Sequence, residues 1–376
     1  MKVLITGANG FVGKNLQLHL AERKDVQVVL FTRDDDVSQL PILLEEVSFV
    51  FHLAGINRPQ DSKEFTTGNL DLTRSLCEAV CAVAEGTGKK IPIVYTSSTQ
   101  AERDNPYGQS KRGAEDVLLD MARSHQVPVH IFRLPNVFGK WCKPNYNSAV
   151  ATFCHNIARD LPIQINDPAA SVTLVYVDDV AERFVQLMDG TDAVVGADGF
   201  ATIVPQYTVT IGELARQLQA FKDSRSTQVI ERVGTGLVRT LYATYVSYLP
   251  VESFAYTVPQ YADPRGVFVE MLKTHDSGQF SYFTAHPGIT RGGHYHHTKT
   301  EKFLVIKGRA CFKFRQMQTG QEHELVTIGD KPEIVETIPG WTHDITNIGN
   351  DEMIVMLWAS EIFDRARPDT FACPLQ

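Results

Sequence analysis

Three histidines and a glutamate are concentrated in the stretch GGHYHHTKTEKFLVIKG. In an extended strand alternate side chains share a face, so His294 and His296 point together while His297 points away. Glu301 follows in the same stretch, and His343 comes later, in IPGWTHDITNIG. Three imidazoles and one carboxylate form a nitrogen-rich set that suits zinc, nickel, iron or manganese. The predicted metal ligands are therefore His294, His296, Glu301 and His343.

A second group of reactive residues lies in YTSSTQAERDNPYGQSK, where Tyr107 and Lys111 are four residues apart. That spacing places both side chains on one face of a helix. A tyrosine titrates near pH ~10 and is a weak acid–base catalyst at neutral pH, but an adjacent ammonium lowers its pKa. A serine hydroxyl of the preceding Ser pair can hold a substrate carbonyl. The pattern predicts an oxidoreductase site.

A glycine-rich turn, TGANGFVG, follows the first apolar stretch and opens a predicted helix. Glycines allow the backbone to approach a pyrophosphate closely, and the helix N-terminus supplies N–H groups and positive potential. The turn is therefore predicted to bind a dinucleotide, through Gly7, Gly10, Phe11, Val12 and Gly13.

The end of the second predicted strand, LFTRDDD, indicates which dinucleotide binds. NAD-selective folds place an acidic residue there for the ribose 2′-hydroxyl, whereas this chain has Thr32 and Arg33. A guanidinium suits a 2′-phosphate, so NADPH is the predicted cofactor. Three aspartates, residues 34–36, follow directly and oppose this interpretation.

Alternating strands and helices must position these residues. KVLIT, VQVVLF, VSFVFHLAG, IPIVYTSS and VHIFRLP are predicted strands, and the segments between them include helical patterns at residues 66–85 and 107–124. This alternation predicts an α/β Rossmann-type doubly wound parallel sheet. Residues 211–248 are also predicted to be helical.

The pattern changes after LPVESFAYTVPQYADPRG, which contains three prolines and no periodicity. Short strands separated by Gly, Pro, Asn and Asp then predict an all-β barrel or jelly roll. The predicted organisation is a dinucleotide-binding domain at 1–248, a linker at 249–261 and a barrel domain at 262–376.

The bulk composition of the 376 residues, with 43% hydrophobic and 21% charged residues, is that of an ordinary globular protein of two or three domains. The net charge of -8 and the absence of Lys/Arg clusters exclude nucleic acid and anionic membranes as expected partners. The six scattered cysteines, the lack of a signal-peptide pattern and the lack of a long apolar run predict a cytoplasmic protein.

Residues 1 to about 248 resemble the extended short-chain dehydrogenase/reductase family, which acts mostly on nucleotide sugars. The matching pieces are TGANGFVG, VFHLAG, YTSS, YGQSK, RLPNVFG and YVDDVA. The resemblance implies a catalytic triad of Ser98, Tyr107 and Lys111, with Asn69 supporting the lysine through water. It also implies cofactor contacts from Leu53, Ala54, Gly55, Tyr107, Lys111, Pro135 and Asn136. The short connection between the second and third strands departs from the family, so the adenine pocket must be built differently.

The histidine region resembles the cupin pattern. The spacing from Gly288 through the predicted ligands to Gly308 fits the first cupin motif, and Gly340, His343 and Asn347 fit part of the second. DPRGVF and TRGGHY also resemble metal-free 3,5-epimerases of the cupin superfamily, in which the histidine matching His294 is the base. Here His296 and Glu301 complete a ligand set, so a metal is favoured. The epimerase base stays open, with four nearby candidates expected to be surface groups: His297, Lys299, Lys302 and Asp344.

The two halves in this order resemble a bifunctional bacterial family of capsule and O-antigen synthesis. The resemblance implies C3 epimerisation of a UDP-2-acetamido-2,6-dideoxy-4-hexulose and C4 reduction to UDP-2-acetamido-2,6-dideoxy-L-talose, on the route to UDP-N-acetyl-L-fucosamine. It further implies zinc in the cupin and a homodimer.

Three alternatives remain open at this point. The barrel can be a non-catalytic module that binds sugar or mediates dimerisation beside a single-step reductase. Three histidines and a glutamate can also hold Fe(II) for an oxygenase. A dehydratase or 4-epimerase that retains NAD is a third alternative, although Arg33 argues against it.

Overall fold

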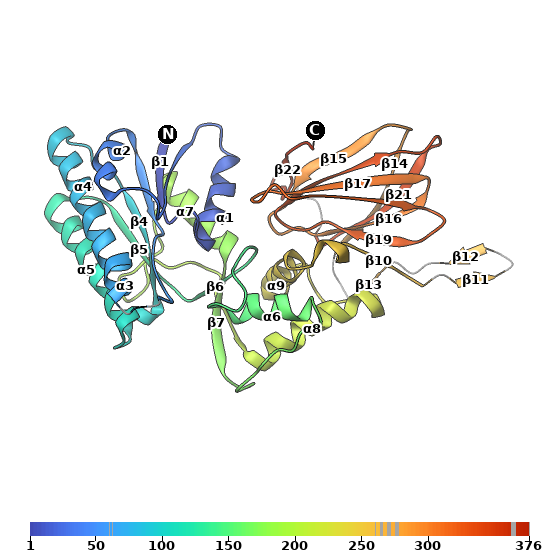
Figure 1. Ribbon diagram of the computed structural model, residues 1–376, viewed down its shortest axis with the longest axis horizontal. Coiled ribbons are helices and arrows are strands. Elements are labelled where there is room, and N and C mark those ends of the chain that lie inside the picture. Colours follow the sequence, from blue (N-terminus) through green and yellow to red (C-terminus); the bar gives the residue numbers. More distant parts are fainter. Residues whose placement is uncertain are drawn as a thin grey trace. The chain divides into compact units, whose positions relative to one another are not determined.

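The computed structural model describes residues 1–59, 61, 63–259, 261–263, 266–268, 272–274, 278–361 and 366–375 (Figure 1). The chain divides into two compact units, which we call the first unit (1–137 with 173–208) and the second unit (138–172 with 209–376). Helices that precede the predicted linker belong to the same unit as the barrel. The predicted division into a domain at 1–248, a linker at 249–261 and a domain at 262–376 stays a prediction.

A five-stranded parallel sheet forms the centre of the first unit, in the order β2-β1-β3-β4-β5. Its strands are β1 (Lys2–Thr6), β2 (Gln27–Phe31), β3 (Phe49–His52), β4 (Ile93–Ser98) and β5 (Val129–Leu134). The predicted doubly wound parallel sheet is therefore confirmed. β2 lies at the sheet edge because residues 32–48, all described, contain only η1 (Val37–Gln39) and α2 (Leu40–Glu46).

Helices cover both faces of this sheet (Figure 1). Alternation along β1 sends Leu4 into one core, while Val3 and Ile5 enter the other. The Leu4 face is covered by α2, α4 (Leu72–Thr87) and α5 (Pro106–His125), and the opposite face by α1 (Phe11–Ala21) and α7 (Val177–Met188). Strands buried on both faces read as continuous apolar runs, which is why the sequence predicted them well.

The second unit joins α6 (Ala149–Ile157), α8 (Ile211–Thr227) and α9 (Gly236–Ser247) to a barrel of two antiparallel sheets. The sheet orders are β10-β19-β16-β21-β14 and β18-β17-β20-β15-β22, and the predicted all-β cupin barrel is confirmed. The strands are β10 (Ala255–Thr257), β14 (Gln279–Ala285), β15 (Thr290–Tyr295), β16 (Glu301–Lys307), β17 (Arg309–Gln316), β18 (Glu322–Ile328), β19 (Glu333–Glu336), β20 (Trp341–Asn347), β21 (Met353–Ala359) and β22 (Phe371–Ala372).

Smaller elements complete the described chain. The strands β6 (Asn136–Phe138), β7 (Ser171–Tyr176) and β8 (Tyr207–Thr210) form a three-stranded sheet, and two pairs stand apart: β9 (Val229–Ile230) with β13 (Lys273–Thr274), and β11 (Tyr261–Asp263) with β12 (Gly266–Phe268). The short helices are α3 (Lys63–Phe65), the π-helical η2 (Thr66–Asp71), η3 (Thr99–Glu102) and η4 (Val251–Ser253).

A buried charge network fastens the helices of the second unit to the barrel. Glu336 of β19 binds Lys302 of β16 and Arg225 of α8, and it accepts a hydrogen bond of 3.2 Å from the Tyr242 hydroxyl of α9. Burial lowers the pKa of Lys302, but the Glu336 carboxylate together with the Tyr242 and Tyr256 hydroxyls outweighs this, so that pKa lies above its usual value. The network is stable only as a whole, because each charge compensates another.

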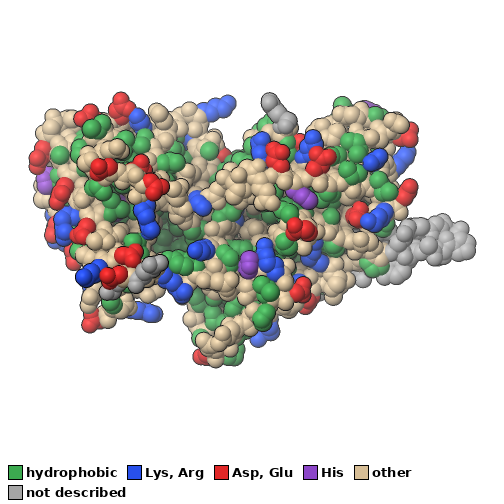
Figure 2. Space-filling model, in the orientation of Figure 1, with side chains coloured by type: hydrophobic (Ala, Val, Ile, Leu, Met, Phe, Trp, Pro, Cys, Tyr) green, Lys and Arg blue, Asp and Glu red, His purple; other side chains and the backbone are tan. Residues whose placement is uncertain are grey.

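The surface has no strong charge bias on the face shown in Figure 2, where acidic and basic side chains are mixed. Within the described residues, no helix is both long and apolar enough to cross a membrane. All six cysteines are present as free thiols.

We predict that Glu336→Ala destabilises the second unit by about 3–5 kcal/mol, because it leaves Lys302 buried without a counter-charge. Unfolding in urea can be followed by tryptophan fluorescence, since Trp141, Trp341 and Trp358 all lie in this unit.

Glu333→Ala is the matched control for this prediction. Glu333 lies on the same strand and pairs with the exposed Lys331, so its removal should cost about 0.5 kcal/mol or less. Equal effects of the two substitutions would show that the buried network contributes no more than a surface pair.

Candidate active sites

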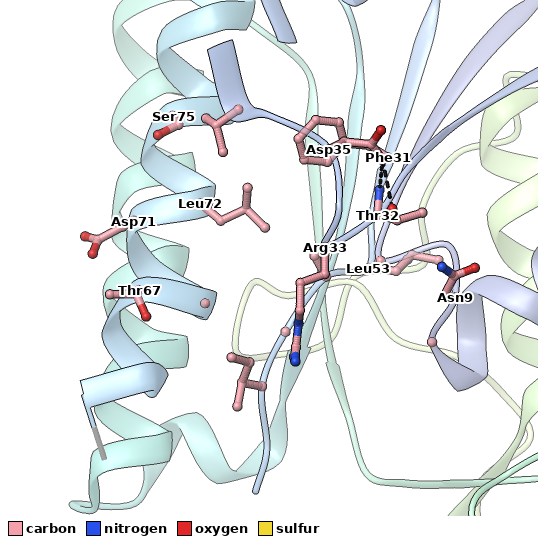
Figure 3. Close-up of a pocket in the computed structure, with 17 residues that line it drawn as sticks. Asn9, Phe31, Thr32, Arg33, Asp35, Leu53, Thr67, Asp71, Leu72 and Ser75 are labelled. Atoms are coloured by element: carbon pink, nitrogen blue, oxygen red, sulfur yellow. Dashed lines mark hydrogen bonds between the residues drawn. The ribbon is translucent and has the colours of Figure 1, made fainter. Parts of the chain in front are cut away.

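A cavity of about 540 Å³ opens in the first unit at the carboxyl ends of β1 and β3 (Figure 3). This is the point where the strand order reverses, the usual location of a ligand in an open α/β sheet. The predicted cofactor residues that line it are Gly7, Gly10, Thr32, Arg33, Leu53, Ala54 and Gly55. The other predicted ones, Phe11, Val12, Gly13, Tyr107, Lys111, Pro135 and Asn136, are not part of its lining.

The glycine turn can pack against the neighbouring backbone only because it lacks side chains. Gly7 has a φ of +67°, and a Cβ atom there would lie 2.6 Å from the backbone of Ala54. Gly10 is the N-cap of α1 and provides no side-chain cap, so N–H groups of the first helical turn remain available to an anion. The turn therefore fits the pyrophosphate of NAD(P).

Arg33 points into the cavity (Figure 3) and has no hydrogen bond or ion pair with any described residue. The neighbouring acids are used locally. The Asp35 carboxylate accepts hydrogen bonds from the Thr32 N–H (2.7 Å) and hydroxyl (2.8 Å), and Asp36 caps η1 through Ser38. The guanidinium is therefore available to an anionic ligand at this edge.

The opposite wall of the cavity was missed by the sequence analysis. Thr67, Asp71 and Ser75 line it from η2 and α4, together with Gly68 and Leu72. The sequence does contain a sign of this wall, because its three polar residues are spaced four apart and so share one helix face. In the structure this wall stands beside the short β2–α2 connection, which agrees with the expected departure from the family.

The structure brings Ser98 and Tyr107 into contact. Ser98 ends β4, and Tyr107 lies in the first turn of α5, where Asn105 caps the helix by accepting from Gly108 N at 2.8 Å. Burial raises the pKa of Tyr107, and its hydrogen bond with Ser98 opposes that rise, so the expected lowering of this pKa by an adjacent ammonium was wrong. A Tyr hydroxyl that keeps its proton at neutral pH can act as an acid.

Lys111 lies one turn further along α5 and is only 5% exposed. Its Nζ donates to the Thr96 carbonyl at 3.0 Å and to the Tyr95 hydroxyl at 3.4 Å. Burial lowers its pKa to about 8, while Glu115 raises it. A Cβ atom at position 55 would lie 2.9 Å from the Lys111 Nζ. Gly55, which has no side chain, therefore leaves space for the ammonium.

Asn69 occupies the π-helical turn η2 and is buried. Its amide binds both backbone polar groups of Ile56, at 2.8 and 3.1 Å, and donates to Ser110 at 2.9 Å. Asn69 thus links the loop after β3 to α5, and the predicted support of Lys111 through water stays a prediction.

The four predicted metal ligands converge in the barrel of the second unit. One ligand atom from each of His294, His296, Glu301 and His343 lies within 4.8 Å of all the others. Glu301 Oε2 is 3.1 Å from His296 Nε2 and 3.5 Å from His343 Nε2. β15 ends at Tyr295, one residue before His296, so the convergence does not arise from strand alternation alone.

The donor set fits a divalent cation. Neither ring nitrogen of the buried His343 has a hydrogen-bond partner among the described residues, which leaves a lone pair directed at the cluster. Burial and the neighbouring imidazoles lower the pKa of His294 to about 4, so this ring is neutral at pH 7. Neutral imidazoles and an ionised carboxylate are the forms that bind metal.

The candidate bases were expected at the surface, and this expectation was wrong: His297, Lys299, Lys302 and Asp344 are all buried. Lys302 and Asp344 follow Glu301 and His343 directly in their strands and therefore point to the opposite faces. His297 packs against Phe371. Lys299 alone of the four reaches the cluster, with Nζ 3.2 Å from Glu301 Oε1.

Family models match both parts of the chain. Residues 3–200 match the NAD dependent epimerase/dehydratase family, and residues 261–371 match the polysaccharide biosynthesis C-terminal domain. The chain belongs to the NAD dependent epimerase/dehydratase family.

Known proteins are similar over the whole chain. UDP-2-acetamido-2,6-beta-L-arabino-hexul-4-ose reductase of Pseudomonas aeruginosa is 61% identical over 375 residues, covering 99% of this chain and 98% of that protein. The crystal structure of capsular polysaccharide assembling protein CapF from Staphylococcus aureus matches with a TM-score of 0.68 and 41% identity, covering 100% of both chains. These matches confirm the predicted resemblance to a bifunctional nucleotide-sugar enzyme family.

A likeness in fold alone extends further. UDP-glucuronic acid 4-epimerase from Bacillus cereus, in complex with NAD, is 20% identical with a TM-score of 0.52, over 59% of this chain and 83% of that one.

We predict that Gly7→Ala weakens dinucleotide binding by about 10- to 100-fold, because the added methyl group forces the Ala54 backbone away by an amount that costs about 1–3 kcal/mol. Isothermal titration with the dinucleotide would measure the loss.

Gly88→Ala separates the clash from backbone strain. Gly88 also has a positive φ, +75°, but a Cβ there meets nothing within 4 Å. This control should lose some stability and keep its affinity. A similar loss of affinity in both variants would place the effect in strain rather than in the cofactor turn.

Proposed function

We propose that this chain is a bifunctional nucleotide-sugar enzyme. The barrel epimerises C3 of a UDP-2-acetamido-2,6-dideoxy-4-hexulose, and the first unit reduces C4 with NADPH to give UDP-2-acetamido-2,6-dideoxy-L-talose, on the route to UDP-N-acetyl-L-fucosamine. The observation that carries the proposal is the presence of two separate reactive groupings in one chain: the dinucleotide cavity with its Ser–Tyr–Lys set, and the His₃Glu cluster.

The reduction follows from the residues around Tyr107. NADPH supplies the hydride that is added to the C4 carbonyl carbon. Ser98, in contact with Tyr107, is placed to hold the carbonyl oxygen, and the Tyr107 hydroxyl gives its proton to the alkoxide that forms. The Lys111 ammonium stabilises the resulting tyrosinate, and its pKa of about 8 keeps it mostly protonated at pH 7.

The epimerisation uses the acidity of the substrate. The C4 carbonyl makes the C3 proton removable, because the electron pair delocalises into an enolate, and return of the proton to the other face inverts C3. His294, His296, Glu301 and His343 would hold a divalent cation, with zinc proposed, which supplies Lewis acidity. Reduction at C4 then removes the carbonyl and traps the new configuration.

NADPH preference is proposed because Arg33 enters the cavity while Asp35 and Asp36 are engaged in their own turns. We also propose a homodimer, because the resemblance to the bifunctional family implies one. We propose a cytoplasmic location, with which the six free thiols agree.

A single-step reductase with a non-catalytic, metal-binding barrel is the second candidate. It is favoured by the orientation of Lys302 and Asp344, which face away from the ligand cluster and leave few groups to move a proton.

We predict that Arg33→Ala weakens NADPH binding by about 10- to 100-fold, because it removes charge-assisted hydrogen bonds to the 2′-phosphate, and leaves NADH binding nearly unchanged. Dissociation constants for both cofactors would be measured by fluorescence titration. Arg123→Ala, on the exposed end of α5, is the control and should alter neither. Equal weakening of both cofactors would rule out recognition of the 2′-phosphate by Arg33.

We predict that the chain exchanges the C3 proton of the UDP-linked 4-keto-6-deoxy amino sugar in D₂O without NADPH, as observed by proton NMR. His294→Ala should stop the exchange. Tyr107→Phe should leave exchange intact and slow reduction by about 10²–10⁴-fold once NADPH is added.

These two variants are matched controls for each other, because each removes a side chain from one site only. Oxidation of NADPH by a wild-type chain that never exchanges C3 would establish the single-step reductase instead.

A further inference from the structure

The C-terminal segment, residues 366–375, lies against the turn that carries two groups of the metal site. This turn, residues 296–299, contains His296 and Lys299. The Asp369 carboxylate accepts from three consecutive backbone N–H groups of the turn, those of residues 297, 298 and 299, at 2.8, 2.7 and 2.6 Å. It also accepts from the Thr298 hydroxyl at 2.9 Å. One carboxylate therefore fixes the whole turn.

The same residue orients a predicted ligand directly. The Asp369 carbonyl oxygen lies 2.5 Å from His296 Nδ1. A carbonyl can only accept, so Nδ1 carries the proton that binds it, and Nε2, 3.1 Å from Glu301 Oε2, is the ring nitrogen that faces the ligand cluster. This is the arrangement that fixes the tautomer and the ring orientation of a metal-binding histidine.

The next residue reaches a second ligand through Lys299. The Lys299 ammonium lies 3.2 Å from the Thr370 hydroxyl and 3.2 Å from Glu301 Oε1. Glu301 Oε2 faces His296 and His343, so the two carboxylate oxygens are divided between the lysine and the imidazoles. This division holds Glu301 to a single oxygen at the cluster.

The segment also has anchors that do not involve Asp369. β22 pairs with β15 at His294 and Tyr295, and Cys373 N donates to Gly293 O at 2.7 Å. Removal of the Asp369 side chain should therefore release the 296–299 turn without detaching the segment.

We propose that Asp369, with Thr370, is a positioning residue of the barrel metal site: the C-terminal segment closes the site by fixing the tautomer of His296 and the orientation of Glu301. The inference rests on the proposed metal site. It gives Asp369 and Thr370, about 70 positions along the chain from His296 and Glu301, a role in metal affinity and geometry.

The test uses the full-length chain and two probes, Zn²⁺ in competition with a chromophoric chelator, and Co²⁺ followed by its visible absorption. Asp369→Ala should weaken binding of both ions by about 10- to 100-fold and change the Co²⁺ spectrum, because the ligand geometry is lost. Asp369→Asn, which retains an acceptor oxygen, should restore part of the affinity. Thr370→Val, which removes only the hydroxyl and preserves packing, should weaken binding by about 3- to 10-fold.

Asp330→Ala, at an exposed turn of the same barrel, is the control and should match the wild-type chain. Unchanged affinity and spectrum in both Asp369→Ala and Thr370→Val would overturn the inference while leaving the metal site in place. A wild-type chain that binds neither ion would overturn the proposed metal site and the inference together.

Discussion

Buried charge is the constraint on which both sites depend, and strand β16 shows it most directly. Glu301 and Lys302 are consecutive, so their side chains leave opposite faces of the strand, and both are almost completely buried. Glu301 has the Lys299 ammonium as its counter-charge and faces the ligand imidazoles, and Lys302 is paired with Glu336. An isolated charge at this depth would cost several kcal/mol, so each side of the strand requires its own partners. The register of the strand is consequently set by charge as much as by apolar packing.

The first unit follows the same rule behind its Ser–Tyr–Lys set. Glu115, 1% exposed, accepts from Arg133 at 2.7 and 3.1 Å and from the Ser97 hydroxyl. It lies on α5 one turn beyond Lys111 and raises the lysine pKa against the effect of burial. Ser97 adjoins Ser98, so one buried carboxylate connects the strand end to the helix that carries the tyrosine and the lysine. Such a network holds the strand end and the helix in place, because movement of Glu115 or Arg133 would leave a buried charge unpaired.

Elements with one strong physical signal could be predicted from the sequence. The strands β1, β3 and β4 are buried on both faces, and all five parallel strands read as apolar runs. The glycine turn is identified by a steric need that only glycine satisfies. The apolar periodicity of a strand is weak in β20, because WTHDITN carries polar residues on both faces, His343 inward and Asp344 outward. The 366–375 segment gave no signal at all, since Asp369 acts on a turn 72 residues away and is flanked by no periodic pattern. Long-range polar contacts of this kind leave no local periodicity.

The departure after β2 shows how one missing element changes a binding site. The resembling family usually fits another helix, strand and helix between the second and third strands, whereas here β2 is the edge of the sheet and α2 packs with α4. The far wall of the cavity is then formed by η2 and the first turn of α4. Asn69 lies in the same π-helical turn and binds both Ile56 of the cavity lining and Ser110 of α5. A π-helical turn adds a residue to a helix and redirects the side chains that follow. Two features therefore depend on the π-helical turn η2. One is the far wall of the cavity, and the other is the Asn69 hydrogen bond to α5, the helix that carries Lys111.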